Sequence, residues 1–179
     1  MRCAIYIDGQ NLYFTQRMCL GWSVDLRKLI EYFENRGAKV TDCFYYTAYN
    51  PEAENQNSFL QMITNFGYAV ITKPLKTIQT ETGLKHKGDM AVEVVLDMFN
   101  LIETYDCAIL LSGDSQFERP LKMLRARGKD FYVIAHEDTL SIELRNIAGD
   151  HYLDITAMEK YIRLQQRHAH PYVSQIAQA

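Results

Sequence analysis

Residues 107–117 read CAILLSGDSQF, an apolar run of five residues followed by Ser-Gly and then Asp114. The start of the chain repeats this arrangement, because residues 3–7 read CAIYI and are followed at once by Asp8. Short, unbroken runs of β-prone apolar residues predict strands that are buried on both faces of a parallel sheet. Ligands of such sheets bind in the crevice outside the carboxyl ends of the strands. We therefore expect Asp8 and Asp114 at that edge.

Similar apolar segments alternate with helical patterns along most of the chain. We expect strands at residues 3–7, 40–49, 68–72, 107–111, 131–135 and 151–155, and helices at residues 25–35, 51–66, 89–102, 117–127 and 140–147. The polar and basic stretch 73–87 is expected to be a hairpin tip or a mobile loop. Strands joined by helices predict right-handed crossovers and an α/β fold, with a mostly parallel sheet and helices on both faces.

Length and composition point to one domain. The chain has 179 residues, of which 47% are hydrophobic and 23% charged, and these proportions exclude a disordered chain. We expect a domain over residues 1–155 and a C-terminal helix and polar tail over residues 156–179. That tail is either a frayed end or an oligomerisation arm, which would give a homodimer. No apolar run reaches the roughly 18 residues of a membrane span, and the first residues do not resemble a signal peptide. We expect a cytoplasmic protein.

The charge is unevenly distributed. The net charge is −3, so the field of the whole molecule does not attract a polyanion. Basic residues nevertheless gather in two groups, which are Lys73, Lys76, Lys85, His86 and Lys87, and Arg119, Lys122, Arg125, Arg127 and Lys129. They are either solvated faces or locally basic surfaces that accept the phosphates of a nucleic acid.

The cysteines lack any recognisable ligand spacing. Cys3, Cys43 and Cys107 fall in apolar, strand-like runs, where cysteine behaves as a small hydrophobic residue. Cys19 has no second cysteine near it in a CxxC pair. We expect neither a disulfide framework nor a zinc site. His136 is expected to satisfy local hydrogen bonds rather than to move protons.

The helix expected from residue 89 carries three acidic residues. Asp89 and Glu93 are four residues apart and share a face, whereas Asp97 is rotated by roughly 80° from Asp89. The helix dipole alone also explains Asp89, and a polar face explains the other two. Asp97 stands among apolar residues, where an unpaired carboxylate is costly, so we expect it to have a partner or a metal.

Carboxylates that converge on one crevice repel one another unless protons or a cation intervene. Sites rich in oxygen suit magnesium or manganese better than softer metals. Such a cation can activate water for an in-line phosphoryl displacement, and the neighbouring basic groups would position a phosphate backbone. The residues alone therefore suggest a metal-dependent phosphodiesterase. A phosphatase-like phosphoesterase is a weaker alternative, because the sequence carries no nucleophile motif for it.

Three motifs together resemble the NYN domain, the LabA-like branch of the PIN-like nucleases. They are IDGQNLY at residues 7–13, Lys87-Gly88 with the helix through Asp97, and LSGDSQF at residues 111–117. The resemblance also covers Ser141-x-x-Leu144 with Ala148, and it extends from about residue 2 to residue 155. It implies a PIN-like three-layer α/β sandwich and a ribonuclease that depends on Mg²⁺ or Mn²⁺ and acts on RNA.

By matching position, the resemblance makes Asp8 and Asp114 metal ligands. Asp89, Glu93 or Asp97 would supply the third carboxylate, with Asp89 as the third candidate ligand. Asn11 and Ser115 would line the site, although both residue types are also common helix caps. RNA phosphates and other substrate groups would be held by Gln116, Lys85, Lys87 and Arg119.

The sequence departs from the family pattern at two places. Gln116 stands where the family usually has a second aspartate after Ser-Gly-Asp-Ser, and Ala91 replaces an aspartate of the helix motif. Gln116 still forms hydrogen bonds but lacks the charge. Asp89 would substitute for the lost acid only if the helix begins later, with Asp89 on the incoming segment. A second hypothesis is therefore an RNA-binding or regulatory module with weakened catalysis.

Overall fold

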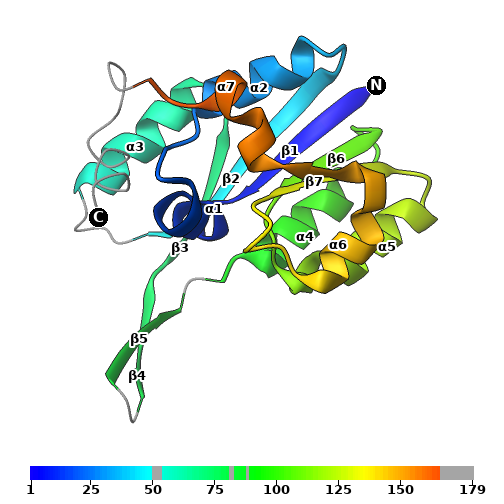
Figure 1. Ribbon diagram of the computed structural model, residues 1–179. Helices are drawn as coiled ribbons and strands as arrows, with labels where there is room; N and C mark the ends of the chain where they lie inside the picture. Colours follow the sequence, from blue (N-terminus) through cyan, green and yellow to red (C-terminus); the bar gives the residue numbers. More distant parts are fainter. Residues whose placement is uncertain (50–53, 81–82, 88, 166–179) are drawn as a thin grey trace.

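The computed structural model describes residues 1–49, 54–80, 83–87 and 89–165; at residue 54 and across residues 76–80 and 83–87 it describes the backbone alone. Among these residues, six strands form one parallel sheet in the order β3-β2-β1-β6-β7-β8. They are β1 (Arg2–Asp8), β2 (Lys39–Tyr49), β3 (Ala69–Pro74), β6 (Cys107–Leu111), β7 (Asp130–Ala135) and β8 (Tyr152–Asp154). The two apolar runs of the sequence are thus neighbouring strands at the centre of the sheet (Figure 1).

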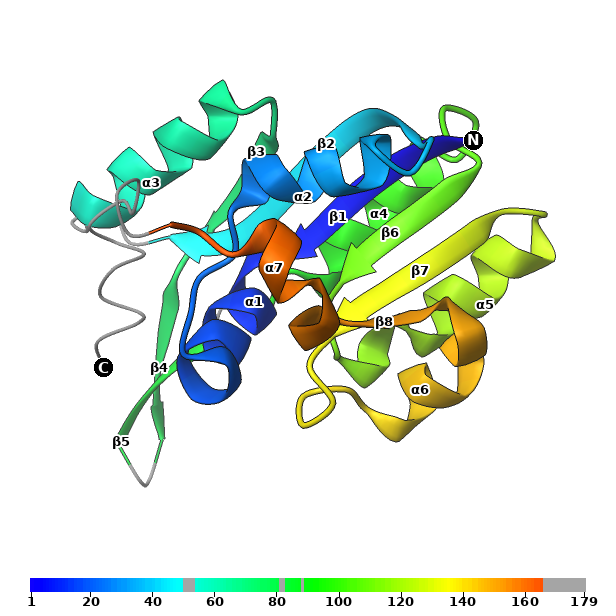
Figure 2. The same cartoon turned by 45° about the horizontal axis from the view of Figure 1, so that its top comes forward.

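Helices cover both faces of the sheet, which makes three layers (Figure 2). One face carries α1 (Gly9–Thr15), the π-helical turn η1 (Gln16–Leu20), α2 (Leu26–Glu34), α3 (Glu54–Asn65) and α7 (Glu159–Ile162); the other carries α4 (Ala91–Asn100), η2 (Ser115–Phe117), α5 (Glu118–Ala126) and α6 (Ile142–Ala148). The α/β fold and its layers are confirmed. None of the described helices is long and apolar enough to cross a membrane.

Alternation along β1 explains how one strand supports two cores. Cys3, Ile5 and Ile7 join the core cluster that contains the buried side chains of α2, because successive side chains point to opposite faces. Ala4 and Tyr6 join the cluster that contains those of α4 and α5. The strand is therefore buried on both sides, as its unbroken apolar run predicts.

Two segments differ from the expected pattern, and a third, for which the sequence left a hairpin tip or a loop open, forms a hairpin. Helices α1 and η1 occupy residues 9–20, where no element is expected from the sequence. The polar stretch 73–87 forms an antiparallel hairpin of β4 (Lys76–Thr80) and β5 (Gly83–Lys87), which protrudes from the body of the protein (Figure 1). Near the C-terminus, η4 (Ile155–Met158) and α7 bury Met158 and Ile162 in the core, so the packed unit continues past residue 155.

Candidate active site

Asp8 ends β1 and caps α1, and its carboxylate is held by neutral donors. Its Oδ1 accepts a hydrogen bond of 3.1 Å from the backbone N–H of Asn11, and its Oδ2 accepts one of 3.1 Å from the hydroxyl of Ser112. Burial raises the pKa of Asp8, the two hydrogen bonds oppose that rise, and the charge of Asp114 adds to it. Asp8 is therefore a mostly buried acid whose charged form is costly.

Hydrogen bonds tie the end of β6 to the end of β1. The side-chain Oδ1 of Asn11 accepts from the backbone N–H of Gly113 at 3.2 Å, and Ser112 Oγ accepts from the N–H of Asp114 at 3.2 Å. Asn11 is not a helix cap, because Asp8 caps α1. Ser112 is fully buried, and sequence reasoning gave it no role although it links the two acidic residues. A buried serine directly after an apolar strand is the signal that identifies it.

The amide of Gln116 lies between two carboxylates. Its Nε2 donates to Asp89 Oδ2 at 3.3 Å and to Asp114 Oδ2 at 3.4 Å. Asp114 also caps η2, because its Oδ1 accepts from the backbone N–H of Gln116 at 2.9 Å. Asp114, rather than the exposed Ser115, is therefore the cap of this turn. Gln116 therefore places a neutral hydrogen-bond donor between the carboxylates of Asp89 and Asp114.

Asp89 reaches this group because α4 begins later than expected. The helix begins at Ala91, and the Oδ1 of Asp89 accepts from the backbone N–H of Ala91 at 2.9 Å. The other oxygen of Asp89 faces Gln116. The expectation that Asp89 lies within the helix and shares a face with Glu93 is thus wrong, and the incoming segment places its carboxylate beside that of Asp114.

Glu93 and Asp97 have their contacts elsewhere on the sheet. Glu93 forms an ion pair with Lys73 of β3, while its Oε2 is buried and has no hydrogen-bond partner among the described residues. Asp97 accepts a hydrogen bond of 3.0 Å from the hydroxyl of Tyr46 on β2, which is the partner that its apolar surroundings require. In the described part of the chain, no hydrogen bond joins either residue to Asp8, Asp89 or Asp114.

The predicted phosphate-binding residues lie in two places. Arg119 is exposed near the start of α5, directly after η2. Lys85 and Lys87 belong to β5, where Lys87 pairs in register with Lys76, but their side chains lie outside the described residues. The backbone of β5 leads toward Asp89 and α4. The hairpin with the basic residues is therefore close in the chain to Asp89, one of the three carboxylates of the site.

The donor atoms of this edge suit a hard divalent cation. Asp8, Asp89 and Asp114 offer carboxylate oxygens, which are the ligands that magnesium and manganese prefer. Within the described residues these three acids do not bring one oxygen each within 4.8 Å of one another. The type of donor atom thus fits a magnesium or manganese ion, although Gln116 lies between two of the acids.

The chain is similar to known proteins along nearly its whole length. The NYN domain model matches residues 2–156. The low amplitude and bright protein LabA of Synechococcus elongatus is 35% identical over 177 residues, which cover 97% of this chain and 93% of that protein. A crystal structure of a Vibrio parahaemolyticus protein of unknown function is 26% identical and has a TM-score of 0.74, covering 91% of this chain and 96% of the other.

Proposed function

The chain belongs to the NYN domain family, which is a family of PIN-like nucleases, and from that premise we propose that it is a ribonuclease that hydrolyses RNA phosphodiester bonds with Mg²⁺ or Mn²⁺. One observation carries the proposal: Asp8 is mostly buried at the end of a central strand, beside Asp114, with no cationic partner among the described residues. A carboxylate with a perturbed pKa at such a place is typical of a functional site.

In this proposal the residues have three roles: cation ligands, positioning residues and phosphate-binding residues. Asp8 and Asp114 are the principal ligands, and Asp89 is the third. Ser112 and Asn11 orient Asp8 and fix the end of β6 against β1 through their hydrogen bonds. A divalent cation bound by these acids supplies an activated water and offsets charge on the phosphoryl group. Arg119, Lys85 and Lys87 bind phosphates of the RNA backbone, which positions the chain without reading its sequence.

Cleavage of labelled single-stranded and hairpin RNAs tests this proposal. The purified protein is incubated with Mg²⁺, Mn²⁺ or a chelator, beside Asp114→Asn and a control, Asp150→Asn, which changes an exposed aspartate of η3 (Gly149–His151). We expect cleavage that needs the cation, is lost in Asp114→Asn and persists in Asp150→Asn. Cleavage that ignores both the cation and Asp114 would contradict the proposal.

Gln116 favours a second function, an RNA-binding module with weakened catalysis. Its amide donates to Asp89 and Asp114, so a neutral group already satisfies oxygens that a cation would need. Ala91 removes a further acid of the family motif. This module would bind RNA with an affinity that falls as salt rises, and no cation would produce cleavage. The double change Gln116→Asp with Ala91→Asp would then create activity, and its failure to do so would count against this second function.

A cytoplasmic location and a homodimer remain predictions from the sequence. Sedimentation of the purified chain at two concentrations distinguishes a monomer from a dimer, and the RNA assay is best interpreted with that result known.

A further inference from the structure

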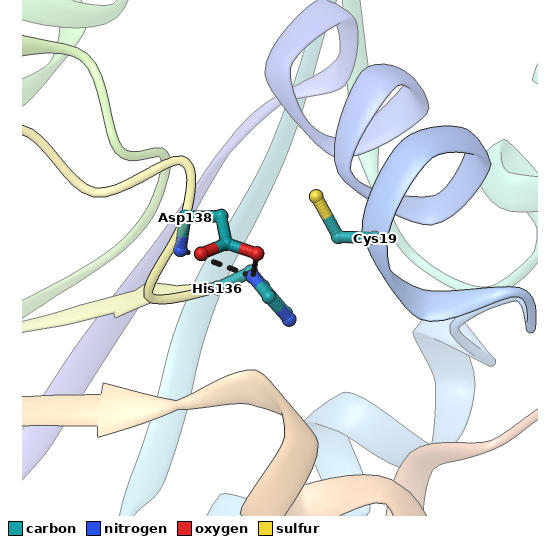
Figure 3. A group of neighbouring side chains, drawn as sticks. All are labelled: Cys19, His136 and Asp138. Carbon is teal, nitrogen blue, oxygen red and sulfur yellow. Dashed lines mark hydrogen bonds and ion pairs between the residues drawn. The ribbon is translucent and has the colours of Figure 1, made fainter.

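A second group of potential ligands lies apart from the carboxylates. One ligand atom from each of Cys19, His136 and Asp138 lies within 4.8 Å of the others (Figure 3). Cys19 comes from η1, and the other two residues follow the end of β7. Figure 3 shows the sulfur of Cys19 on the side that faces the Asp138 carboxylate. Elements far apart in the sequence therefore bring sulfur, nitrogen and oxygen atoms to one place.

The imidazole of His136 offers a lone pair at this place. Its side chain is 12% exposed, and its Nδ1 lies 3.6 Å from Asp138 Oδ2. The backbone N–H of Asp138 donates to Nδ1 at 3.1 Å. Neutral imidazole is the form that binds metals. A cation at Nδ1 would replace this hydrogen bond, and the N–H of Asp138 is exposed to water.

The three donors select a different class of cation from the acids around Asp8. We propose that Cys19, His136 and Asp138 form a site for Zn²⁺ or a similar borderline-soft divalent cation. Thiolate, imidazole and carboxylate are all zinc ligands, whereas magnesium and manganese prefer oxygen alone. Three protein ligands leave the fourth tetrahedral position for water, and Asp138, which is 75% exposed, gives the site access to solvent.

The alternative use of Cys19 as a reactive thiol has less support. Burial and the Asp138 carboxylate both raise the pKa of the Cys19 thiol. A reactive cysteine needs the opposite, because the thiolate is the nucleophile and neighbouring positive charge is what favours it. A bound cation supplies that positive charge and takes the place of the thiol proton.

A cation at this site would fasten the segment that supports Asp114. The carbonyl group of Thr139 packs so closely on Gly113 that a Cβ there would meet its carbon at 2.7 Å. The N–H of Ser141 donates to Gly113 O at 2.9 Å. Thr139 and Thr15 also share a hydrogen bond of 3.3 Å between their hydroxyls. A cation that links η1 to residues 136–138 would therefore hold in place the segment around Thr139, which packs on Gly113, and the end of α1 at Thr15.

Metal titration of the full chain in a thiol-free reductant tests the site directly. Titration with Co²⁺ is followed by the thiolate-to-cobalt charge-transfer absorption, and Zn²⁺ binding is measured by calorimetry with excess Mg²⁺ to occupy the carboxylates. We expect one Zn²⁺ per chain and the thiolate band in the parent protein. Since even outer-shell partners of a metal are worth roughly 10–100-fold in affinity, Cys19→Ser and His136→Gln should weaken binding at least 100-fold.

Two controls separate this site from other ligands of the chain. His168→Ala with His170→Ala removes a histidine pair of the C-terminal sequence, and Asp150→Asn removes an exposed aspartate. Both should bind Zn²⁺ as the parent does. Circular dichroism verifies that each variant is folded. Absence of the thiolate band in the parent would overturn the proposal without any variant, and so would unchanged Zn²⁺ affinity in folded Cys19→Ser.

Discussion

The two ends of β1 and β6 use aspartate in opposite ways. At the amino end, Arg2 and Asp106 form an ion pair with 2.7 Å between Nη2 and Oδ1, and both side chains are 44% exposed. Hydrogen bonds from Arg2 lower the pKa of Asp106 to about 2. At the carboxyl end, Asp8 is mostly buried and is held by neutral donors, and burial raises its pKa.

Opposite ends of the same two strands therefore hold one acid whose pKa is lowered and one whose pKa is raised. An ordinary structural aspartate is either exposed or paired, because an unpaired buried charge costs free energy. A protein retains such a cost mainly where function requires it. The carboxyl end is therefore arranged for binding or chemistry, whereas the amino end is arranged for stability.

The largest effect should come from adding a methyl group at the carboxyl end. In Gly113→Ala the new Cβ meets backbone atoms of Thr139, which cannot move aside as a flexible side chain can. We expect a loss of about 3 kcal/mol in the free energy of unfolding. The control at the amino end is Gly37→Ala, which meets no atom but has a φ of +85°, and it should cost about 1 kcal/mol. Urea denaturation measures both; equal losses would show that the Gly113 contact is not tight.

Asp97 of α4 is a third acid to compare with Asp8 and Asp106, because a neutral donor holds it away from the candidate site. Asp97 is half-buried, and Tyr46 donates to it at 3.0 Å. Burial raises the pKa of Tyr46, so its hydroxyl stays protonated and remains a donor. Removing a hydrogen bond to a charged group typically costs 1.5–3 kcal/mol, so Tyr46→Phe should lower the free energy of unfolding by about 2 kcal/mol. A change of only a few tenths would mean that water replaces the tyrosine.

The smallest effects should distinguish the two ends by their pH dependence. Asp106 has a lowered pKa, so its contribution to stability is fully present above about pH 4 and is lost as the pH falls toward 2. Asp106→Asn should therefore lower the melting temperature at pH 7, only slightly because the pair is exposed. Asp8 has a raised pKa, so its ionised form opposes folding at neutral pH.

Asp8→Asn should accordingly leave the melting temperature at pH 7 unchanged or raise it. Its advantage over the parent should shrink as the pH falls and Asp8 in the parent becomes protonated. Scanning calorimetry from pH 3 to 7 follows both variants. A strong loss of stability in Asp8→Asn at pH 7 would mean that Asp8 is a structural acid.

The sheet was predictable because its two central strands, β1 and β6, are short apolar runs, and β2, β3 and β7 each contain a short apolar or aromatic run. Helices α1 and η1 were not, because their buried side chains include Thr15 and Gln16. The Oε1 of Gln16 accepts from the backbone N–H of Val24 at 2.7 Å, so a polar side chain fills a buried position. Apolar periodicity is then too weak to reveal the helix.

The sequence was enough to predict that Asp8 and Asp114 lie at the carboxyl ends of strands. Asp8 and Asp114 follow apolar runs, and parallel strands bring such ends to one edge. The contact of Gln116 with Asp89 depends on where α4 begins, and helix boundaries are the least certain part of a sequence pattern. The grouping of Cys19 with His136 and Asp138 depends on tertiary packing of distant segments, which spacing along the chain does not reveal.

RNA cleavage by Asp8→Asn and Asp106→Asn is compared at pH 7 with Mg²⁺ or Mn²⁺, at a temperature where both are folded, to decide whether the carboxyl end of the sheet is the catalytic end. The two changes are chemically identical and lie at opposite ends of β1 and β6. We expect Asp106→Asn to cleave at the rate of the parent and Asp8→Asn to be slower by at least about 100-fold, because it loses a proposed ligand of the cation. Equal rates in the two variants would contradict this expectation.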